Sequence, residues 1–220
     1  MQMPRPESRS EQELKAALLT KLYIGRRIGR ETVLANEYRL GNSGIRADIA
    51  ILGKEFIGIE VKSERDSLRR FPSQLDAYKK YFDRVIILLA EKHLLRTPSI
   101  VSDVELWVEA KGGKILKVHS QPKTVKKNLE LLDLLEKNGR ERFNLEINYH
   151  PTRIQVRSYF ESKFRAKFAY SSSLFWRAVD TGKITKEDLK HLSSYLHEKD
   201  RLDAARSIKM QEILSWERKH

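Results

Sequence analysis

The sequence predicts an α/β protein in which a mixed sheet is flanked by helices and is followed by a helical C-terminal part. Alternating apolar and polar residues between residues 32 and 62 predict three strands, and the continuous apolar run Val85–Ala90 predicts a strand that is covered on both faces. After Pro122 the alternation stops and apolar residues recur at helical spacing. The predicted organisation is a flexible tail at residues 1–10, an α/β domain at residues 11–121 and a helical domain at residues 122–220.

The α/β domain is predicted to open with a helix over Glu11–Arg26. Ser10 followed by Glu13 forms a capping-box pattern, and four leucines then recur at helical spacing. The next elements are separated by turn-forming segments rich in glycine, and Pro72 suits the first turn of a helix. These elements are predicted as strands at Thr32–Leu40, Ile45–Leu52 and Glu55–Lys62, a helix from Pro72 to Tyr81, a strand at Val85–Ala90, and a hairpin of Leu106–Ala110 with Lys114–His119.

The helical part is predicted from apolar residues that repeat every three or four positions. Val125, Leu129, Leu132 and Leu135, for example, fall on one face of a helix. The predicted helices cover Thr124–Lys137, Thr152–Lys167, Leu174–Asp180 and Lys186–Trp216.

Composition restricts the classes of function. The chain has 220 residues, a formal net charge of +13 and no cysteine. The charge favours a polyanionic partner, nucleic acid before an anionic membrane surface, and the lack of cysteine excludes thiolate nucleophiles and cysteine-ligated zinc. The longest apolar run is far shorter than the roughly 20 residues of a spanning helix, and the first ten residues lack an apolar signal segment. We therefore expect a cytoplasmic protein without a membrane partner; a homodimer stays open.

Charged residues gather on one face of the second and third predicted strands. Side chains alternate along a strand, so Asp48, Glu60 and Lys62 share a face while the opposite face is wholly apolar. The residues of the predicted apolar face are Ile45, Ala47, Ile49, Ile51, Ile57, Ile59 and Val61. If Leu52 pairs with Phe56, the paired residue numbers sum to 108 and Asp48 lies opposite Glu60. A slip of one residue would invert this pattern, so the prediction requires a loop of three residues at 53–55, or a bulge of equal parity.

Two carboxylates on adjacent strands repel each other unless a cation lies between them. Hard oxygen ligands suit Mg²⁺ or Mn²⁺, which bind through one or two carboxylates together with substrate phosphate. A lysine beside them can stabilise charge on a reacting phosphate or act as a base. Asp48, Glu60 and Lys62 therefore predict metal-assisted hydrolysis of a phosphodiester. The alternative interpretation of the three residues is a salt-bridge ladder on the surface of a sheet.

Asp48 followed by Glu60-Val61-Lys62 resembles the PD-(D/E)XK nuclease superfamily, whose fold is that of the restriction endonucleases. Ala47 replaces the proline of the motif. Glu37, Ser63, Gln74 and Tyr78 extend the resemblance to a small branch found in bacteria and phages, over roughly residues 10–120. The resemblance implies a restriction-endonuclease-like core and a metal-dependent nuclease, with a DNA endonuclease favoured.

The resemblance also implies roles for single residues. Asp48, Glu60 and the Val61 carbonyl would bind Mg²⁺ or Mn²⁺, and Glu37 would reach the metal directly or through water. Lys62 would be the catalytic lysine. Gln74 would orient Lys62 or the scissile phosphate, whereas we interpret Tyr78, one turn further along the same helix, as a packing residue.

Other residues leave alternatives open. Glu13 is the second choice to Glu37 for the additional acid, and Asp103 with Glu109 forms a weaker competing acidic pair. Arginines that border the predicted site or share one face of a helix are predicted to contact nucleic acid: Arg65, Arg69, Arg70, Arg153 and Arg157. The alternative to a nuclease is a catalytically inactive module of the same fold that binds nucleic acid or a protein partner.

Overall fold

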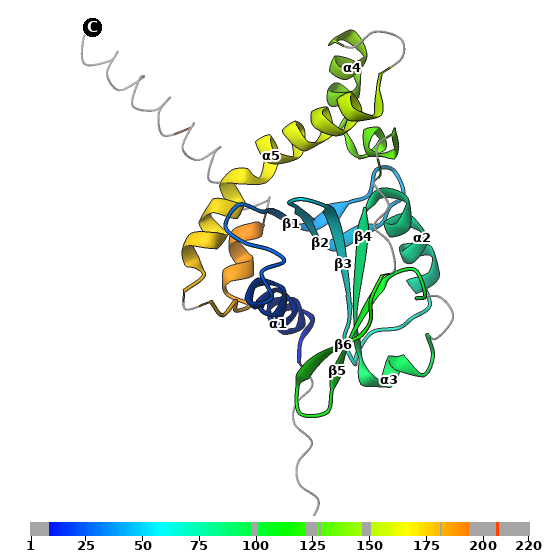
Figure 1. The fold of residues 1–220 in the computed structure, drawn as a ribbon, viewed down its shortest axis with the longest axis vertical. Coiled ribbons are helices and arrows are strands. Elements are labelled where there is room, and N and C mark those ends of the chain that lie inside the picture. Colours follow the sequence, from blue (N-terminus) through cyan, green and yellow to red (C-terminus); the bar gives the residue numbers. More distant parts are fainter. Residues whose placement is uncertain are drawn as a thin grey trace, which may run out of the picture.

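The computed structural model describes residues 9–97, 101–121, 127, 129–146, 151–180, 182–193 and 206. Its centre is a six-stranded mixed sheet in which the strands lie side by side in chain order, with helices on both faces (Figure 1). The predicted α/β class with a mixed sheet between helices is confirmed. The strands are β1 (Val33–Arg39), β2 (Arg46–Leu52), β3 (Phe56–Lys62), β4 (Arg84–Ala90), β5 (Glu105–Ala110) and β6 (Lys114–His119).

Helix α1 (Glu11–Ile24) begins at the predicted cap. The Ser10 hydroxyl accepts a hydrogen bond from the Glu13 N–H at 3.3 Å, and the Glu13 carboxylate accepts one from the Ser10 N–H at 2.9 Å. Both halves of the capping box are therefore present. The helix ends two residues before the predicted Arg26 and buries its four leucines against the sheet.

The register of the first three strands fixes where the site residues lie. Strand β2 runs antiparallel to β3 with Leu52 opposite Phe56 and Ala50 opposite Gly58, so the predicted register is confirmed. Residues 53–55 form the connecting turn, in which the Gly53 N–H donates to the Glu55 carbonyl at 3.1 Å. Strand β1 pairs antiparallel with the other side of β2.

The pairing then changes from antiparallel to parallel, since β3, β4 and β5 are parallel neighbours. Helix α2 (Phe71–Tyr81) connects β3 to β4 and carries Pro72 in its first turn, as predicted. The short helix α3 (Glu91–Leu94) follows β4, and β5 with β6 forms the predicted hairpin. Residues 85–90 of β4 are buried throughout, as expected for a strand covered on both faces.

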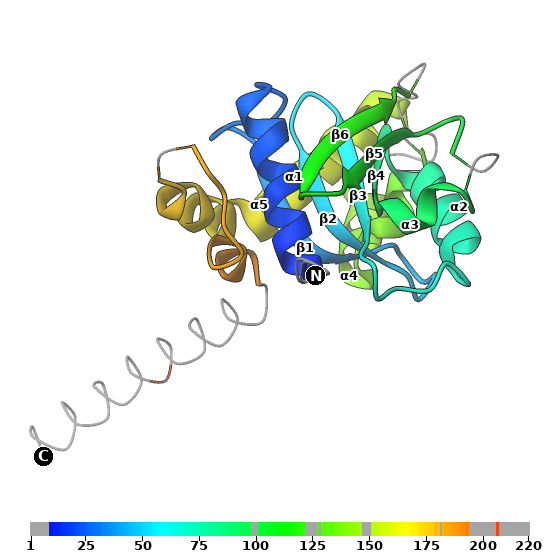
Figure 2. The same cartoon turned by 90° about the horizontal axis from the view of Figure 1, so that it is seen from below.

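Each face of the sheet has its own hydrophobic cluster. Helix α1 packs on one face with isoleucines of β2 and β3, and α2 packs on the other face with Phe56 and Phe82. Figure 2 shows α1 and α2 on opposite sides of the sheet. Gly58 lies in contact with Phe82, since a Cβ at this glycine would come within 2.2 Å of the Phe82 ring. The clusters hold the two helices that reach the candidate site.

Helix α5 (Arg153–Ala178) passes the β1 edge of the sheet and joins both clusters. Phe160, Phe164 and Phe168 pack with the α2 side, whereas Phe175 and Trp176 pack with the α1 side. The Ser172 hydroxyl accepts from the Leu34 N–H at 2.8 Å and donates to the Leu34 carbonyl at 3.1 Å. These bonds satisfy Leu34 backbone groups of the edge strand, so α5 closes this edge against pairing with another chain.

The described C-terminal residues therefore share the core of the sheet and form no hydrophobic cluster of their own. Thr152–Lys167 and Leu174–Asp180, predicted as two helices, are one helix, because the serines at residues 171–173 satisfy their hydroxyls within the helix or on β1. The described part of Thr124–Lys137 is mostly the 3-10 helix η1 (Leu129–Leu134), followed by α4 (Lys137–Glu146).

The last predicted helix, Lys186–Trp216, lies mostly outside the described residues. Its described beginning contains the 3-10 helix η2 (Asp188–Leu192) rather than an α-helix. No strand occurs beyond residue 122 in the described ranges. Within the same ranges, no helix has the length and apolar character required to cross a membrane.

Candidate functional site

The candidate site lies where β2 begins and β3 ends. The paired ladder between these strands runs to Ile49 opposite Ile59, one step before Asp48 and Glu60. The Asp48 side chain continues it in place of a backbone group, because its Oδ2 accepts the Val61 N–H at 2.6 Å. The structure thus places Asp48 against the β3 backbone beside Glu60. The predicted shared face is not found, because the Asp48 carboxylate pairs with Lys15 of α1, whereas Glu60 takes donors from α2 on the opposite face.

Glu60 is buried, and each of its oxygens is held by a donor. Gln74 donates to Oε1 at 2.8 Å, the Lys62 ammonium forms an ion pair with the same oxygen, and the Tyr78 hydroxyl donates to Oε2. Gln74 and Tyr78 come from adjacent turns of α2. Gln74 was predicted to orient Lys62 or the scissile phosphate. In this structure its side chain binds and orients Glu60.

Tyr78 does more than the packing that its sequence position indicates. The ring is fully buried, and its hydroxyl accepts from the Asp48 N–H at 3.1 Å while it donates to Glu60. Burial, followed by the charges of Glu60 and Asp48, raises the pKa of Tyr78 well above its usual value, so the hydroxyl keeps its proton. One hydroxyl consequently links the two strands that carry the site.

Lys15 is a site residue that sequence reasoning missed. Its side chain on α1 has 0% exposure, and Nζ lies 2.6 Å from Glu11, 2.9 Å from Glu37 and 3.4 Å from Asp48 Oδ1. The sequence does carry a signal for it. Lys15 lies three and four residues before Leu18 and Leu19 on the apolar stripe of α1, and a lysine on a buried face requires a buried acid as its partner.

Glu37 reaches the site through an irregular backbone. Its φ is +51°, and neither Glu37 nor Asp48 belongs to the regular β1–β2 pairs on either side of them. The alternation of side chains changes phase here, so Ala47 packs in the same cluster as Ala50. The prediction that Ile45 and Ala47 share a face with Ile49 is therefore wrong, because the local bend turns the strand.

The carboxylates of the site lie close enough to one another to change the pKa of Asp48. Burial, and then repulsion from Glu60, raises the pKa of Asp48 to about 7, while Lys15 and the Val61 N–H act in the opposite direction. Carboxylate oxygens of Glu11, Glu37 and Asp48 lie within 4.8 Å of one another. Glu60 is not a member of this group, and the Lys15 ammonium lies among the three acids.

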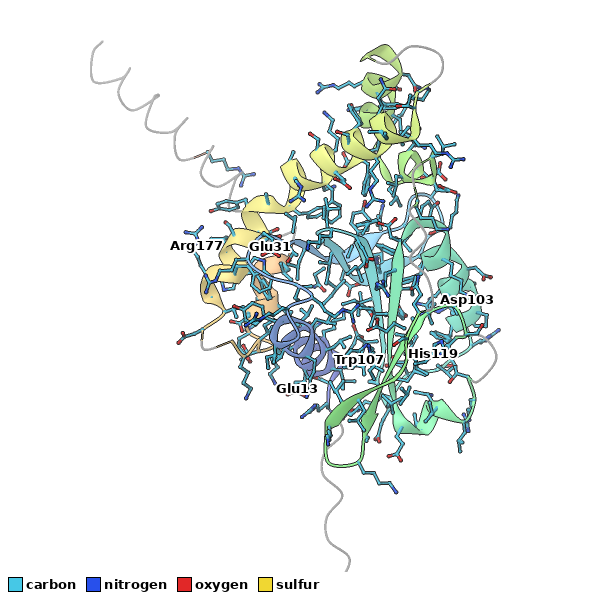
Figure 3. The ribbon with its side chains drawn as sticks, in the orientation of Figure 1. Glu13, Glu31, Asp103, Trp107, His119 and Arg177 are labelled. Carbon is cyan, nitrogen blue, oxygen red and sulfur yellow. The ribbon has the colours of Figure 1, made fainter. Side chains whose placement is uncertain are left out.

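The two alternative acidic assignments lie elsewhere. Glu13, labelled in Figure 3, caps α1 and pairs with Lys186 at 2.9 Å. Asp103 precedes β5 and pairs with Lys79 at 3.2 Å, whereas Glu109 lies near the other end of β5. None of these three residues joins the Asp48 and Glu60 carboxylates.

The arginines predicted to contact nucleic acid divide into two groups. Arg65, Arg69 and Arg70 are exposed in the segment between β3 and α2, next to the site, and Arg153 is exposed at the start of α5. The structure does not support the predicted phosphate contact of Arg157. Its guanidinium holds the buried Asp83 through bonds of 2.8 and 2.7 Å and pairs with Glu161, so these acids consume the donors that a phosphate would need.

These features define an α/β protein with a buried site of acids and lysines at the end of its central strands. The family model described as bacteriophage P4 protein cII matches residues 4–193, and the chain belongs to this family. Protein cII of Enterobacteria phage P4 is 39% identical over 82 residues, which cover 37% of this chain and 31% of that protein. The alignment thus spans less than a third of that relative's length.

Among solved structures, the SPO1766 protein of unknown function from Silicibacter pomeroyi is similar to this chain. The superposition covers 72% of this chain and 90% of that chain, with a TM-score of 0.41 and 16% sequence identity.

Proposed function

We propose that this protein is a metal-dependent phosphodiester hydrolase that acts on nucleic acid, with DNA as the favoured substrate. One observation carries the proposal. The Tyr78 hydroxyl accepts from the Asp48 backbone N–H and donates to the Glu60 carboxylate, and the Lys62 ammonium lies on the same carboxylate. A structural salt-bridge ladder has no need of a buried glutamate beside a half-buried aspartate, since the burial of like charges costs free energy.

The order of elements supports a restriction-endonuclease-like core. One helix, three antiparallel strands, a crossover helix and a fourth strand parallel to the third follow one another from α1 to β4. The acids lie on the second and third strands, which is where the resemblance to the PD-(D/E)XK superfamily puts them. We therefore propose that residues 11–121 form a restriction-endonuclease-like core with its active site on β2 and β3.

The donors of the site fit Mg²⁺ or Mn²⁺. Asp48, Glu60 and Glu37 offer carboxylate oxygens and Val61 offers a backbone carbonyl, all of which are hard ligands that these ions prefer. Burial, and then repulsion from Glu60, raises the pKa of Asp48, and a cation at Asp48 would relieve the repulsion. A bound divalent ion would supply Lewis-acid activation of the phosphate and a more acidic attacking water.

The chain's own residues would position and stabilise the reacting groups. Gln74 and Tyr78 fix the Glu60 carboxylate from α2, so Glu60 keeps one orientation. The Lys62 ammonium, beside that carboxylate, would stabilise the negative charge that develops on the phosphate oxygens. The net charge of +13 and the exposed Arg65, Arg69 and Arg70 would attract the polyanion to this end of the sheet. A cytoplasmic location is part of the proposal.

The test is cleavage of single-stranded DNA, duplex DNA and RNA by the wild type with Mg²⁺, Mn²⁺ or chelator. Asp48→Ala and Lys62→Ala should each lower the cleavage rate by about 10²–10³, which is the usual loss when one stabilising group is removed. Asp48→Ala should hold or tighten metal-free DNA binding, because a negative charge is lost, whereas Lys62→Ala should weaken it slightly. Asp103→Asn, an exposed acid outside the site, is the control and should cleave normally.

A catalytically inactive binding module is the second candidate, and one observation favours it. Both oxygens of Glu60 already have donors from the chain itself, so the carboxylate is satisfied without a metal. An inactive module should bind nucleic acid equally well in Mn²⁺ and in chelator and should cleave none of the substrates. Cleavage that requires a metal would eliminate this candidate.

A further inference from the structure

A groove of about 730 Å³ has Glu37 of the acidic cluster in its lining. Its walls come from β1 and β2, from η1, α4 and the segment between them, and from α5. The lining residues used below are Asn36, Glu37, Arg39, Arg46, Arg140 and Lys167. The groove therefore shares Glu37 with the acidic cluster and is otherwise lined by several basic side chains.

Two arginines face each other across the end of the β1–β2 pair. Arg39 lies directly opposite Arg46 in the register, and both are exposed. Like charges at opposed positions of a sheet destabilise it unless an anion lies between them. Among the described residues, neither arginine forms an ion pair, and the same holds for Arg140 on the facing wall.

The acids in this groove are already neutralised. Asp133 pairs with Lys80 at 2.7 Å, and Glu136 pairs with Lys167 at 2.5 Å. The free charge of the groove beyond Glu37 is consequently positive. The groove wall also contains Asn36, whose Oδ1 is the buried side-chain atom without a hydrogen-bond partner in the described part of the chain.

We infer that this groove binds the phosphodiester backbone of one nucleic-acid strand as the strand leaves the candidate site, with Arg39, Arg46 and Arg140 as its phosphate contacts. Guanidinium groups bind phosphate oxygens through two parallel hydrogen bonds, and a phosphate between Arg39 and Arg46 removes their repulsion. This inference deepens the proposed function and rests on it. It gives the substrate a direction, from Asp48 and Glu60 past Glu37 along β1.

The test measures binding of a labelled single strand of DNA to the full chain in chelator, over a range of salt concentrations. Arg39→Gln/Arg46→Gln should weaken binding about tenfold or more and should lower the slope of log K against log salt by about 0.7, since the two arginines share one phosphate and each phosphate contact on a single strand contributes about 0.7. Arg140→Gln should lower the slope by about 0.7. The matched control is Lys114→Gln/Lys117→Gln, which removes two exposed charges from β6 at the far edge of the sheet.

The inference is wrong if the arginine pair and the lysine pair change affinity and slope equally. Thermal unfolding verifies folding, and loss of the opposed arginines should leave the midpoint unchanged or raise it. Cleavage distinguishes this inference from the proposed function. If the wild type cleaves and the arginine variant binds like the control, only the groove is refuted. If the wild type never cleaves but the arginine variant loses binding, the groove stands and the nuclease proposal fails.

Discussion

Lys15→Met removes the one buried ammonium that lies among three acids of the site and leaves a side chain of similar length. Loss of one partner of a buried ion pair costs about 3–5 kcal/mol. The lower end applies here, because the Glu11 and Glu37 side chains are 42% and 45% exposed and solvent screens them, while Asp48 is 14% exposed. We expect a loss of about 3 kcal/mol in the metal-free protein, or roughly 6–12 °C in the unfolding midpoint for a chain of this size.

The same change should tighten binding of Mn²⁺. The ammonium repels any cation at the neighbouring carboxylates, and two unit charges 4 Å apart interact by about 4 kcal/mol at an effective dielectric constant of 20. Partial screening leaves an expected gain of about tenfold or more in affinity, which corresponds to 1.4 kcal/mol. Saturating Mn²⁺ should then recover most of the lost stability of the variant.

The assay is thermal and urea unfolding of both proteins with chelator or Mn²⁺, together with a calorimetric Mn²⁺ titration. Lys21→Met removes an exposed ammonium from the same helix and serves as the control, for which we expect a change within about 0.5 kcal/mol and unaltered Mn²⁺ affinity. A Lys15→Met protein that unfolds like the control, or that binds Mn²⁺ more weakly than the wild type, would refute the electrostatic role of Lys15.

Three further substitutions test the surroundings of the site by urea unfolding. Tyr78→Phe should cost about 1–3 kcal/mol, because buried groups on two strands lose their shared hydroxyl; a loss below about 0.5 kcal/mol would contradict this. Gly58→Ala should cost at least about 1–3 kcal/mol, since the new methyl group would overlap the Phe82 ring, and a neutral result would mean that the ring moves freely. Arg157→Leu should cost about 3–5 kcal/mol by leaving Asp83 buried and unpaired, yet keep the salt slope of DNA binding; a lower slope would restore Arg157 as a phosphate contact.

Periodicity in the sequence was sufficient to predict the sheet and the place of the central acids. The alternation in residues 49–62 determines which residues share a face, and a hairpin with Leu52 opposite Phe56 is the register that keeps the apolar face intact. The same reasoning located Asp48 and Glu60 beside each other. It misplaced Ile45 and Ala47, because the backbone bend at Glu37 leaves no pattern in the residue types.

Contacts between distant segments could not be predicted from the sequence. Arg157 looks like one residue of a basic helix face until α5 is packed against the sheet, where Asp83 meets it from 74 positions away. Lys15 lies on the apolar stripe of α1, but the acids that pair with it are known only once α1 is placed over β2. In both cases the charge is recognisable in the sequence, but its partner is determined by tertiary packing.

Binding of Mn²⁺ to the wild type tests the central claim most directly, because it asks whether Asp48 and Glu60 form a metal site at all. Electron paramagnetic resonance follows the signal of free Mn²⁺ as protein is added. We expect the wild type and the Asp103→Asn control to reduce this signal with the same affinity, and Asp48→Asn and Glu60→Gln to lose that binding. A wild type that leaves the signal unchanged, or site variants that bind Mn²⁺ as the wild type does, would contradict the assignment.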